Sequence, residues 1–316
     1  MRFFARKAFR KRTLYAKRAK SQRGRERLTT SQALTYNQTS LLRWRKIMFA
    51  KIRHIAMYTH NHAAVDKFYQ TVFGMRRMTS NTLDETGKQN ANRGHISDGV
   101  IGLAILSRYA GMQSGMDHFG FEVQDIEEYG RRMERHYPKT MIAKGLEYVP
   151  FAGLRSYDPA GTQFDIAQAH VANVREGYNE SGWEQPRWIN HISIRANDPA
   201  QVAEFYETIF ELKEAETYKD DGSICMTDGK VKLLLRPRDH NLYRGLREGL
   251  DHFGFKVDSL GQTKKDLDDL AATDPYSPSG RFVGGNGKKN EADFRRCCLG
   301  QHFFADPDGV LIDISE

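Results

Sequence analysis

The sequence has few cysteines and no long apolar run. Its 316 residues include three cysteines, Cys225, Cys297 and Cys298. Three cysteines cannot all pair, so a secreted disulfide scaffold is disfavoured and a reducing, cytoplasmic setting is predicted. No apolar stretch is long enough to cross a bilayer as a helix. The sequence therefore predicts a protein that does not act within a membrane.

Acidic residues are almost missing from positions 1–47. This segment holds 15 of the 48 Lys and Arg residues but one of the 40 acids, Glu26, so its net charge is +14. The other 33 basic and 39 acidic residues give the rest of the chain a net charge of −6. The overall charge of +8 is therefore local, and nucleic-acid binding is not indicated except through this tail.

Three interpretations of segment 1–47 stay open. The first is a basic arm that contacts nucleic acid or anionic lipid. The second is a transit-like targeting segment, because such segments are rich in Arg and poor in acids. The third is an over-long reading frame in front of a natural start at Met48, six residues before His54. In each case the segment takes no part in the predicted fold.

Four short stretches repeat one pattern. Asp117–Val123 and Asp251–Val257 are nearly identical, and Arg53–Tyr58 and Asn190–Arg195 resemble them. Each stretch alternates like a strand, carries a histidine near its start and leads into a helix-like segment. The repeat therefore predicts four β-α-β-β-β units, two in each half of the chain.

Helix and turn signals support this division. Apolar residues at helical spacing over 62–73 end at Gly74, a suitable C-terminal cap, and 199–210 repeats the pattern. Asp-Pro-x-Gly turns at 158–161 and 306–309 each lead into a strand-like run.

The composition of residues 171–187 predicts a linker between two domains, 48–170 and 188–316. The fold class is therefore α+β, with two domains in tandem. An insertion-like stretch, Pro275–Asn290, distinguishes the fourth unit from the second and hints at a lid over the C-terminal half.

Each half presents two histidines and one aspartate at equivalent strand positions. They are His54, His118 and Asp165 in the first half and His191, His252 and Asp313 in the second. Two imidazoles and one carboxylate on one face of a sheet can bind a divalent metal from one side, with positions left for substrate, water or oxygen. This set favours Fe(II) first, with Mn(II), Zn(II) and Ni(II) as alternatives.

A single histidine at a strand start is more often a satisfied structural residue than a ligand. Buried imidazoles and carboxylates without partners are costly, however. Six metal-competent side chains at matching positions therefore favour a shared role, and we predict that they bind metal.

These motifs resemble the vicinal oxygen chelate superfamily. The resemblance rests on the four units, the Phe-Tyr-x-x-x-Phe helices, the Asp-His-Phe-Gly-Phe strands and the Asp-Pro-x-Gly-x-x-x-Asp endings, and it covers about residues 50–315. The family includes glyoxalase I, fosfomycin-resistance transferases, bleomycin-resistance proteins and type I extradiol dioxygenases. It implies paired units that curl into open, barrel-like cups with the metal inside, and its ligand positions match the two triads.

Three departures from the family pattern matter. The family's carboxylate ligand is usually Glu, whereas both halves here have Asp. Extradiol dioxygenases usually carry a catalytic Tyr ten residues before that carboxylate, where this chain has Arg155 and Phe303. Two-domain extradiol enzymes commonly keep only the C-terminal metal site, whereas both triads are present here. The usual ring-cleavage route is therefore in doubt. A further possibility stays open, namely that one triad is catalytic and the other structural.

Alternation places four further side chains on the faces of the predicted cups. Tyr58 is a candidate hydrogen-bond donor to an oxyanion and Glu122 a candidate base, while Arg195 and Lys256 are candidates for holding an anionic substrate. Ion pairing at the cup mouth is the alternative role for each. Cys297 and Cys298 are predicted to be buried packing residues rather than reactive ones.

The sequence thus predicts a divalent-metal-dependent enzyme that acts on a small substrate with vicinal oxygens. Dioxygenase-type chemistry leads because of the four-unit layout, and a glyoxalase-type isomerase or lyase is the alternative. A metal-free protein that sequesters a ligand, as bleomycin-resistance proteins do, is a third possibility. A homo-oligomer is compatible with the sequence.

Overall fold

The computed structural model describes residues 49–78, 93–145, 153–169, 184–218, 220–238, 247–276 and 284–316. All of them belong to one unit, Met48–Glu316. The basic segment 1–47, most of the predicted linker and residues 277–283 of the insertion lie outside the described residues. None of the helices in the described part of the chain has the length and apolar character of a membrane span.

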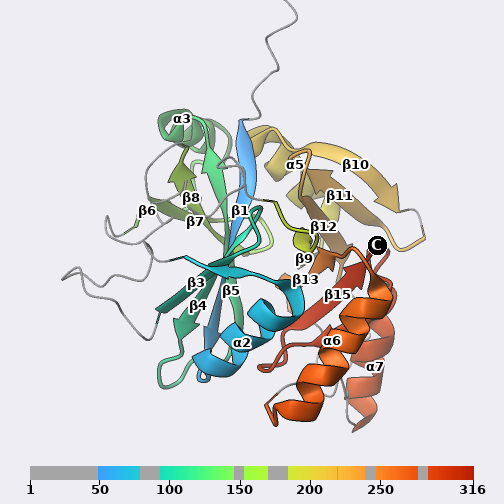
Figure 1. The fold of residues 1–316 in the computed structure, drawn as a ribbon. Helices are drawn as coiled ribbons and strands as arrows, with labels where there is room; N and C mark the ends of the chain where they lie inside the picture. Colours follow the sequence, from blue (N-terminus) through green and yellow to red (C-terminus); the bar gives the residue numbers. More distant parts are fainter. Residues whose placement is uncertain are drawn as a thin grey trace, which may run out of the picture. The chain divides into compact units, whose positions relative to one another are not determined.

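The first half of the chain forms one mixed sheet. Its elements are β1 (Ala50–Thr59), α2 (His62–Phe73), β2 (Arg76–Arg77), β3 (Arg93–Ser97), β4 (Gly102–Ser107), β5 (Gly115–Val123), α3 (Ile126–His136), β6 (Ala143–Lys144), β7 (Leu154–Tyr157) and β8 (Gln163–Gln168). The strand order is β2-β3-β4-β1-β5-β8-β7-β6, with β1 and β5 antiparallel at the centre. Figure 1 shows these elements in blue to green.

The second half repeats this architecture. Its elements are β9 (Trp188–Ala196), α5 (Pro199–Phe210), β10 (Lys213–Tyr218), β11 (Ser223–Thr227), β12 (Lys232–Pro237), β13 (Gly249–Lys256), α6 (Leu260–Thr273), α7 (Gly284–Phe294), β14 (His302–Ala305) and β15 (Leu311–Ser315). The strand order is β10-β11-β12-β9-β13-β15-β14, again with an antiparallel central pair, β9 and β13. In the described part of the fourth unit, α7 stands between α6 and β14.

Local sequence explains where the helices begin and end. The side chain of Asp198 accepts a hydrogen bond from the backbone N–H of Gln201 at the start of α5, and Pro199 fits the first turn because it has no N–H to lose. Gly74 ends α2 at φ 68°, in the left-handed region that glycine tolerates. The predicted helix limits 62–73 and 199–210 are confirmed.

One apolar core joins the two halves. The aromatic face of α2 packs on the second sheet, where Phe73 stacks on Phe255 at 3.6 Å between ring centroids. The face of α5 packs on the first sheet, where Phe210 stacks on Phe121 at 3.9 Å. Each half therefore covers the other's sheet with the helix of its own first unit, and the buried cluster contains residues of both halves.

Two reciprocal hydrogen bonds cross between the halves inside this core. The Tyr69 hydroxyl donates to Oδ2 of Asp306 at 2.9 Å, and the Tyr206 hydroxyl donates to Oδ2 of Asp158 at 2.7 Å. Both aspartates belong to the Asp-Pro-x-Gly turns that the sequence singled out. All four side chains are buried, so the Phe-Tyr helices and these turns hold each other in place.

The predicted α+β class with tandem repeats is confirmed, and the sheets are open rather than closed barrels. The arrangement places β1, β5 and β8 side by side in the first half and β9, β13 and β15 side by side in the second. These strands carry the six predicted ligands.

Candidate metal centres

The predicted ligands of each half converge across three neighbouring strands. On β13, Gly254 pairs with His191 of β9 on one side and with Asp313 of β15 on the other. On β5, Gly120 pairs in the same way with His54 and Asp165. The second histidine, His252 or His118, lies two residues earlier on the same strand and so on the same face.

The glycine of the Asp-His-Phe-Gly-Phe motif makes room for this convergence. A Cβ atom at Gly254 would overlap the His191 ring and the Asp313 carboxylate. A Cβ atom at Gly300 would lie 2.7 Å from Cβ and from Oδ2 of Asp313. A side chain at either position would therefore displace the ligands of the C-terminal half.

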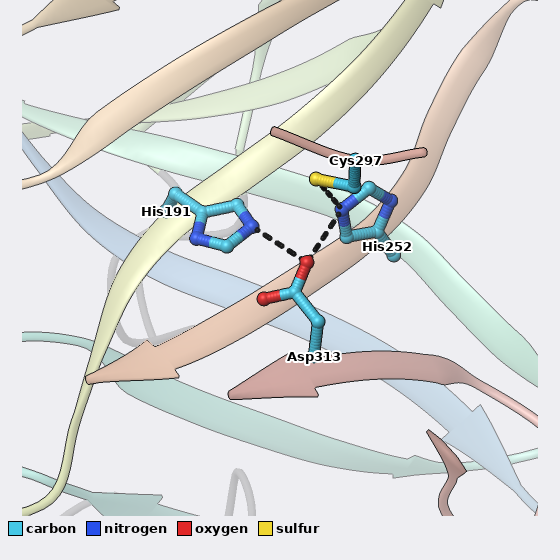
Figure 2. A group of neighbouring side chains, drawn as sticks. All are labelled: His191, His252, Cys297 and Asp313. Carbon is cyan, nitrogen blue, oxygen red and sulfur yellow. Dashed lines mark hydrogen bonds and ion pairs between the residues drawn. The ribbon is translucent and has the colours of Figure 1, made fainter. Parts of the chain in front are cut away.

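Four potential ligands meet in the C-terminal half (Figure 2). Nε2 of His191 and Nε2 of His252 each lie 3.3 Å from Oδ2 of Asp313. Sγ of Cys297 lies 3.3 Å from Nε2 of His252. The histidines and the aspartate have no exposed surface, and Cys297 is 4% exposed.

Neighbouring residues orient both imidazoles of the C-terminal centre. Nδ1 of His191 donates to Oδ1 of Asn190 at 2.8 Å, and Nδ1 of His252 donates to Oδ2 of Asp251 at 2.7 Å. Because Nδ1 of each ring is turned toward an acceptor, Nε2 of each ring faces Asp313. This is the ring orientation that a metal-ligating histidine needs.

A buried ionic network supports Asp251. Nε of Arg195 lies 2.7 Å from Oδ1 of Asp251, and Arg195 also pairs with Asp293 near the end of α7. Arg236 contacts Asp251 and Asp293 as well. Burial raises the pKa of Asp251, but hydrogen bonds from His252 and Arg195 outweigh it and hold this pKa below its ordinary value. Arg195 thus pairs with the acid that orients the His252 ring.

Cys297 is the ligand candidate that the sequence analysis missed. It follows α7, whose Phe294 lies edge-on to the His252 ring at 4.8 Å. A hydrogen bond from Cys298 lowers the pKa of Cys297 against the effect of burial, and the charge of His252 adds to this, which favours the thiolate. The sequence feature that could have pointed to Cys297 is its position just after an insertion that is specific to the fourth unit.

The donor set of the C-terminal centre fits a metal ion. Among the described residues, Nε2 of His191 and both carboxylate oxygens of Asp313 are buried without a hydrogen-bond partner. Buried polar atoms normally have hydrogen-bond partners, and a cation bound between these atoms would satisfy all three. A thiolate, two imidazoles and a carboxylate are ligands that Zn(II) commonly takes.

The N-terminal centre has a different arrangement. Nε2 of His118 lies 3.1 Å from Oδ2 of Asp165, and Nδ1 of His118 donates to Asp117 at 2.7 Å. Arg155 donates from Nε to Oδ1 of Asp165 at 2.7 Å and from Nη2 to Oδ2 at 3.0 Å. Both oxygens of this carboxylate therefore have partners.

The protonation equilibria of the N-terminal centre follow from these contacts. Burial raises the pKa of Asp165, but hydrogen bonds from His118 and Arg155 outweigh it and hold this pKa below its ordinary value. Burial and the charges of His118 and His95 lower the pKa of His54. His95 of β3 is a further buried histidine, 5.9 Å from His54 between ring centroids.

The four other predicted site residues lie apart from one another. In the N-terminal half, Tyr58 is close enough to Arg155 to influence its pKa, and Glu122 is buried in an ion pair with Nε of Arg53 at 3.3 Å. In the C-terminal half, Arg195 belongs to the network described above and Lys256 is exposed. Their roles stay predictions.

A cavity of about 490 Å³ adjoins the C-terminal centre. Its lining includes Lys232, Lys256, Asn190 and Gly300. Asn190 holds the His191 ring, and Gly300 lies directly against Asp313. Lys256 stands four residues after His252 on β13 and so on the same face. The cavity is thus lined by residues that contact the candidate ligands, while the four ligands themselves are not part of its lining.

Comparison with known proteins agrees with this architecture. The family model described as Glyoxalase/Bleomycin resistance protein/Dioxygenase superfamily matches residues 51–166 and 188–314. The chain belongs to this superfamily. No curated protein matches it in sequence.

Solved structures of this superfamily's fold resemble the chain over most of its length. A Mn(II)-bound glyoxalase from Novosphingobium aromaticivorans is 14% identical, with a TM-score of 0.56 over 84% of this chain and 82% of that one. Homoprotocatechuate 2,3-dioxygenase from Arthrobacter globiformis is 15% identical, with a TM-score of 0.55 over 85% of this chain and 80% of that one. At this identity the likeness shows the fold alone.

Proposed function

We propose that this superfamily member is a divalent-metal-dependent enzyme whose metal is held by His191, His252, Asp313 and Cys297. The observation that carries the proposal is the set of buried atoms on His191 and Asp313 that face one another without a hydrogen-bond partner. Two oriented Nε2 atoms and a favoured thiolate complete the donor set. When bound, the ion would supply Lewis-acid stabilisation of a substrate oxyanion.

The thiolate changes the expected metal from Fe(II) to Zn(II). Soft sulfur ligands favour Zn(II), whereas the 2-His-1-carboxylate set alone favours Fe(II) with open positions. Because Cys297 adds a fourth protein donor, a substrate that binds through two oxygens would bring the ligand number to six and leave no place for dioxygen. The donor set therefore favours a non-oxidative isomerase or lyase over ring cleavage.

The substrate is a small anionic compound with two adjacent oxygens. The cavity beside Gly300 supports this, because its lining holds three lysines against two glutamates, and Lys256 is a lysine without an acid paired to it in that lining, whereas Lys232 lies 3.9 Å from Glu216. Lys256 would hold the anionic group of the substrate there. The apolar cluster that includes Phe294, Cys297 and Phe303 keeps water from the buried ligands.

A dioxygenase is the second candidate. Three of the four donors form the 2-His-1-carboxylate set of non-haem Fe(II) oxygenases. Phe303, at the position of the family's catalytic tyrosine, and the Cys297 donor both weigh against it.

Activity assays separate these candidate functions. They use protein loaded either with Zn(II) or, under anaerobic conditions, with Fe(II). Carboxylate-bearing α-hydroxycarbonyl compounds are tested for exchange of the carbon-bound proton in D2O without oxygen. The diol 3,4-dihydroxyphenylacetate is tested for oxygen uptake. Exchange with the Zn(II) protein supports the isomerase or lyase. Oxygen uptake with the Fe(II) protein favours the dioxygenase. If the protein binds no metal but still binds a small molecule, it is a sequestering protein.

Lys256→Gln tests substrate placement. Loss of a charged hydrogen bond costs about 1.5–3 kcal/mol, so KM for a carboxylate substrate should rise about tenfold or more with the metal content unchanged. Lys213→Gln, an exposed lysine of β10 outside the cavity lining, is the matched control. Equal KM values for the two variants would contradict the assigned role of Lys256.

A further inference from the structure

The N-terminal triad has every metal-ligand type in place, yet its carboxylate already has a cation. The guanidinium of Arg155 binds Asp165 through two hydrogen bonds of 2.7 and 3.0 Å. Oδ2 of Asp165 also lies 3.1 Å from Nε2 of His118. Planar guanidinium and carboxylate groups match in this two-point arrangement, which is among the strong polar contacts in proteins.

The C-terminal half has a phenylalanine at the equivalent place. Arg155 pairs with Asp165 across β7 and β8, and Phe303 pairs with Asp313 across β14 and β15. Phe303 lies edge-on to Phe294 at 5.0 Å and offers no donor. Both oxygens of Asp313 consequently have no hydrogen-bond partner among the described residues, although Nε2 of His191 and of His252 lie 3.3 Å from Oδ2. The residue at this one position, Arg155 or Phe303, therefore decides whether the carboxylate opposite it is bound by a guanidinium.

The residues just before the four histidines show a second contrast. Each is the extra residue of a β-bulge, which aims the histidine onto the ligand face. Asp117, Asn190 and Asp251 each accept a hydrogen bond from Nδ1 of the following histidine. The fourth bulge residue, Arg53, is a cation, and it pairs with Glu122.

We propose that Arg155 is the resident cation of the N-terminal site and takes the place of a divalent ion there. His54, His118 and Asp165 then form a latent metal site that Arg155 keeps closed. A divalent ion could enter only after Arg155 releases both oxygens of Asp165. This inference depends on the proposed function in one respect: the expected count of one ion per wild-type chain assumes that this ion is bound in the C-terminal half.

Metal stoichiometry tests this directly. Purified protein is stripped of metal and dialysed against Zn(II), and bound zinc per chain is measured. Arg155→Phe gives the first half the residue of the second, and Arg155→Lys keeps the charge as a matched control. Each variant is checked for an unchanged circular dichroism spectrum and Tm. Wild type and Arg155→Lys should bind one equivalent and Arg155→Phe two.

Further substitutions locate each ion. The second equivalent of Arg155→Phe should disappear on adding His118→Ala, whereas His118→Ala alone should leave the wild-type single equivalent. Phe303→Arg should remove the C-terminal ion by placing a guanidinium on Asp313.

Two results would overturn the inference. One is wild-type protein that binds two equivalents and loses one on His118→Ala. The other is a folded Arg155→Phe variant that binds no more zinc than wild type. A wild type without zinc beside an Arg155→Phe variant with one His118-dependent equivalent would support the inference while refuting the proposed function.

Discussion

At the scale of single residues, small and charged side chains decide which atoms can meet. Gly254 lets His191 and Asp313 approach each other over β13. Arg155 neutralises Asp165 in the other half. Two unit charges 4 Å apart interact by roughly 4 kcal/mol at an effective dielectric constant of 20, and a divalent ion doubles this. A guanidinium and a divalent ion therefore exclude each other from one small site.

Gly254→Ala should damage the C-terminal centre. The added methyl group would overlap His191 and Asp313, and overpacking of this kind costs about 1–3 kcal/mol. We expect a lower free energy of unfolding in urea and loss of bound zinc. Gly130→Ala in α3 is the matched control, because nothing lies within 4 Å of its Cβ position and alanine favours a helix. Unchanged zinc binding by Gly254→Ala would show that the glycine is not needed for ligand convergence.

The convergence of the six predicted ligands could be foreseen from sequence because each belongs to a repeated motif. Cys297 could not, since it occurs once and lies far in sequence from the histidines. The role of Arg155 was also out of reach. Its position was noted as a departure from the family pattern, but only the strand register shows its guanidinium on Asp165.

At the scale of elements, the helices of the first and third units bind the halves together. Periodicity and caps predicted α2 and α5, because their apolar spacing and end signals are local. The same local signals did not predict α7, because its first residues, Gly-Gly-Asn-Gly-Lys-Lys-Asn, suggest a loop. Tertiary contacts of Asp293 and Phe294 with Arg195 and His252 accompany this helix and close one side of the C-terminal centre.

Tyr69→Phe should destabilise the protein by about 1–3 kcal/mol. It leaves Oδ2 of the buried Asp306 without its hydrogen-bond donor, and an unsatisfied buried acceptor costs that much. Urea unfolding measures the change, and Tyr206→Phe, which removes the reciprocal bond to Asp158, should behave alike. Tyr109→Phe, at a residue 62% exposed, serves as control and should be neutral. A neutral Tyr69→Phe would mean that the crossing bonds do not stabilise the fold.

At the scale of the whole molecule, the shared core makes stability depend on pH. Burial raises the pKa of Asp306 to about 7, against hydrogen bonds from Val310 and Tyr69 that lower it. The Asp306 carboxyl group therefore binds a proton more tightly in the native state than in the unfolded chain, where the pKa of an aspartate is about 3.9. The stabilisation is complete below about pH 4 and is lost as the pH rises to about 7.

Asp306→Asn should remove this titration. The free energy of unfolding of wild type relative to the variant should fall by on the order of 2–4 kcal/mol between about pH 4 and pH 7. Urea unfolding at several pH values measures it, with the exposed Asp220→Asn as control. Parallel profiles for wild type and Asp306→Asn would show that Asp306 does not titrate in this range.

X-ray absorption at the zinc edge of the loaded protein tests the central claim most directly. We predict one ion per chain with one sulfur ligand at about 2.3 Å and nitrogen and oxygen ligands at about 2.0–2.2 Å. The sulfur should vanish in Cys297→Ser and persist in Cys298→Ser, because Cys297 alone of the pair lies against His252. A zinc environment without sulfur in wild type, or no bound ion at all, would contradict the account.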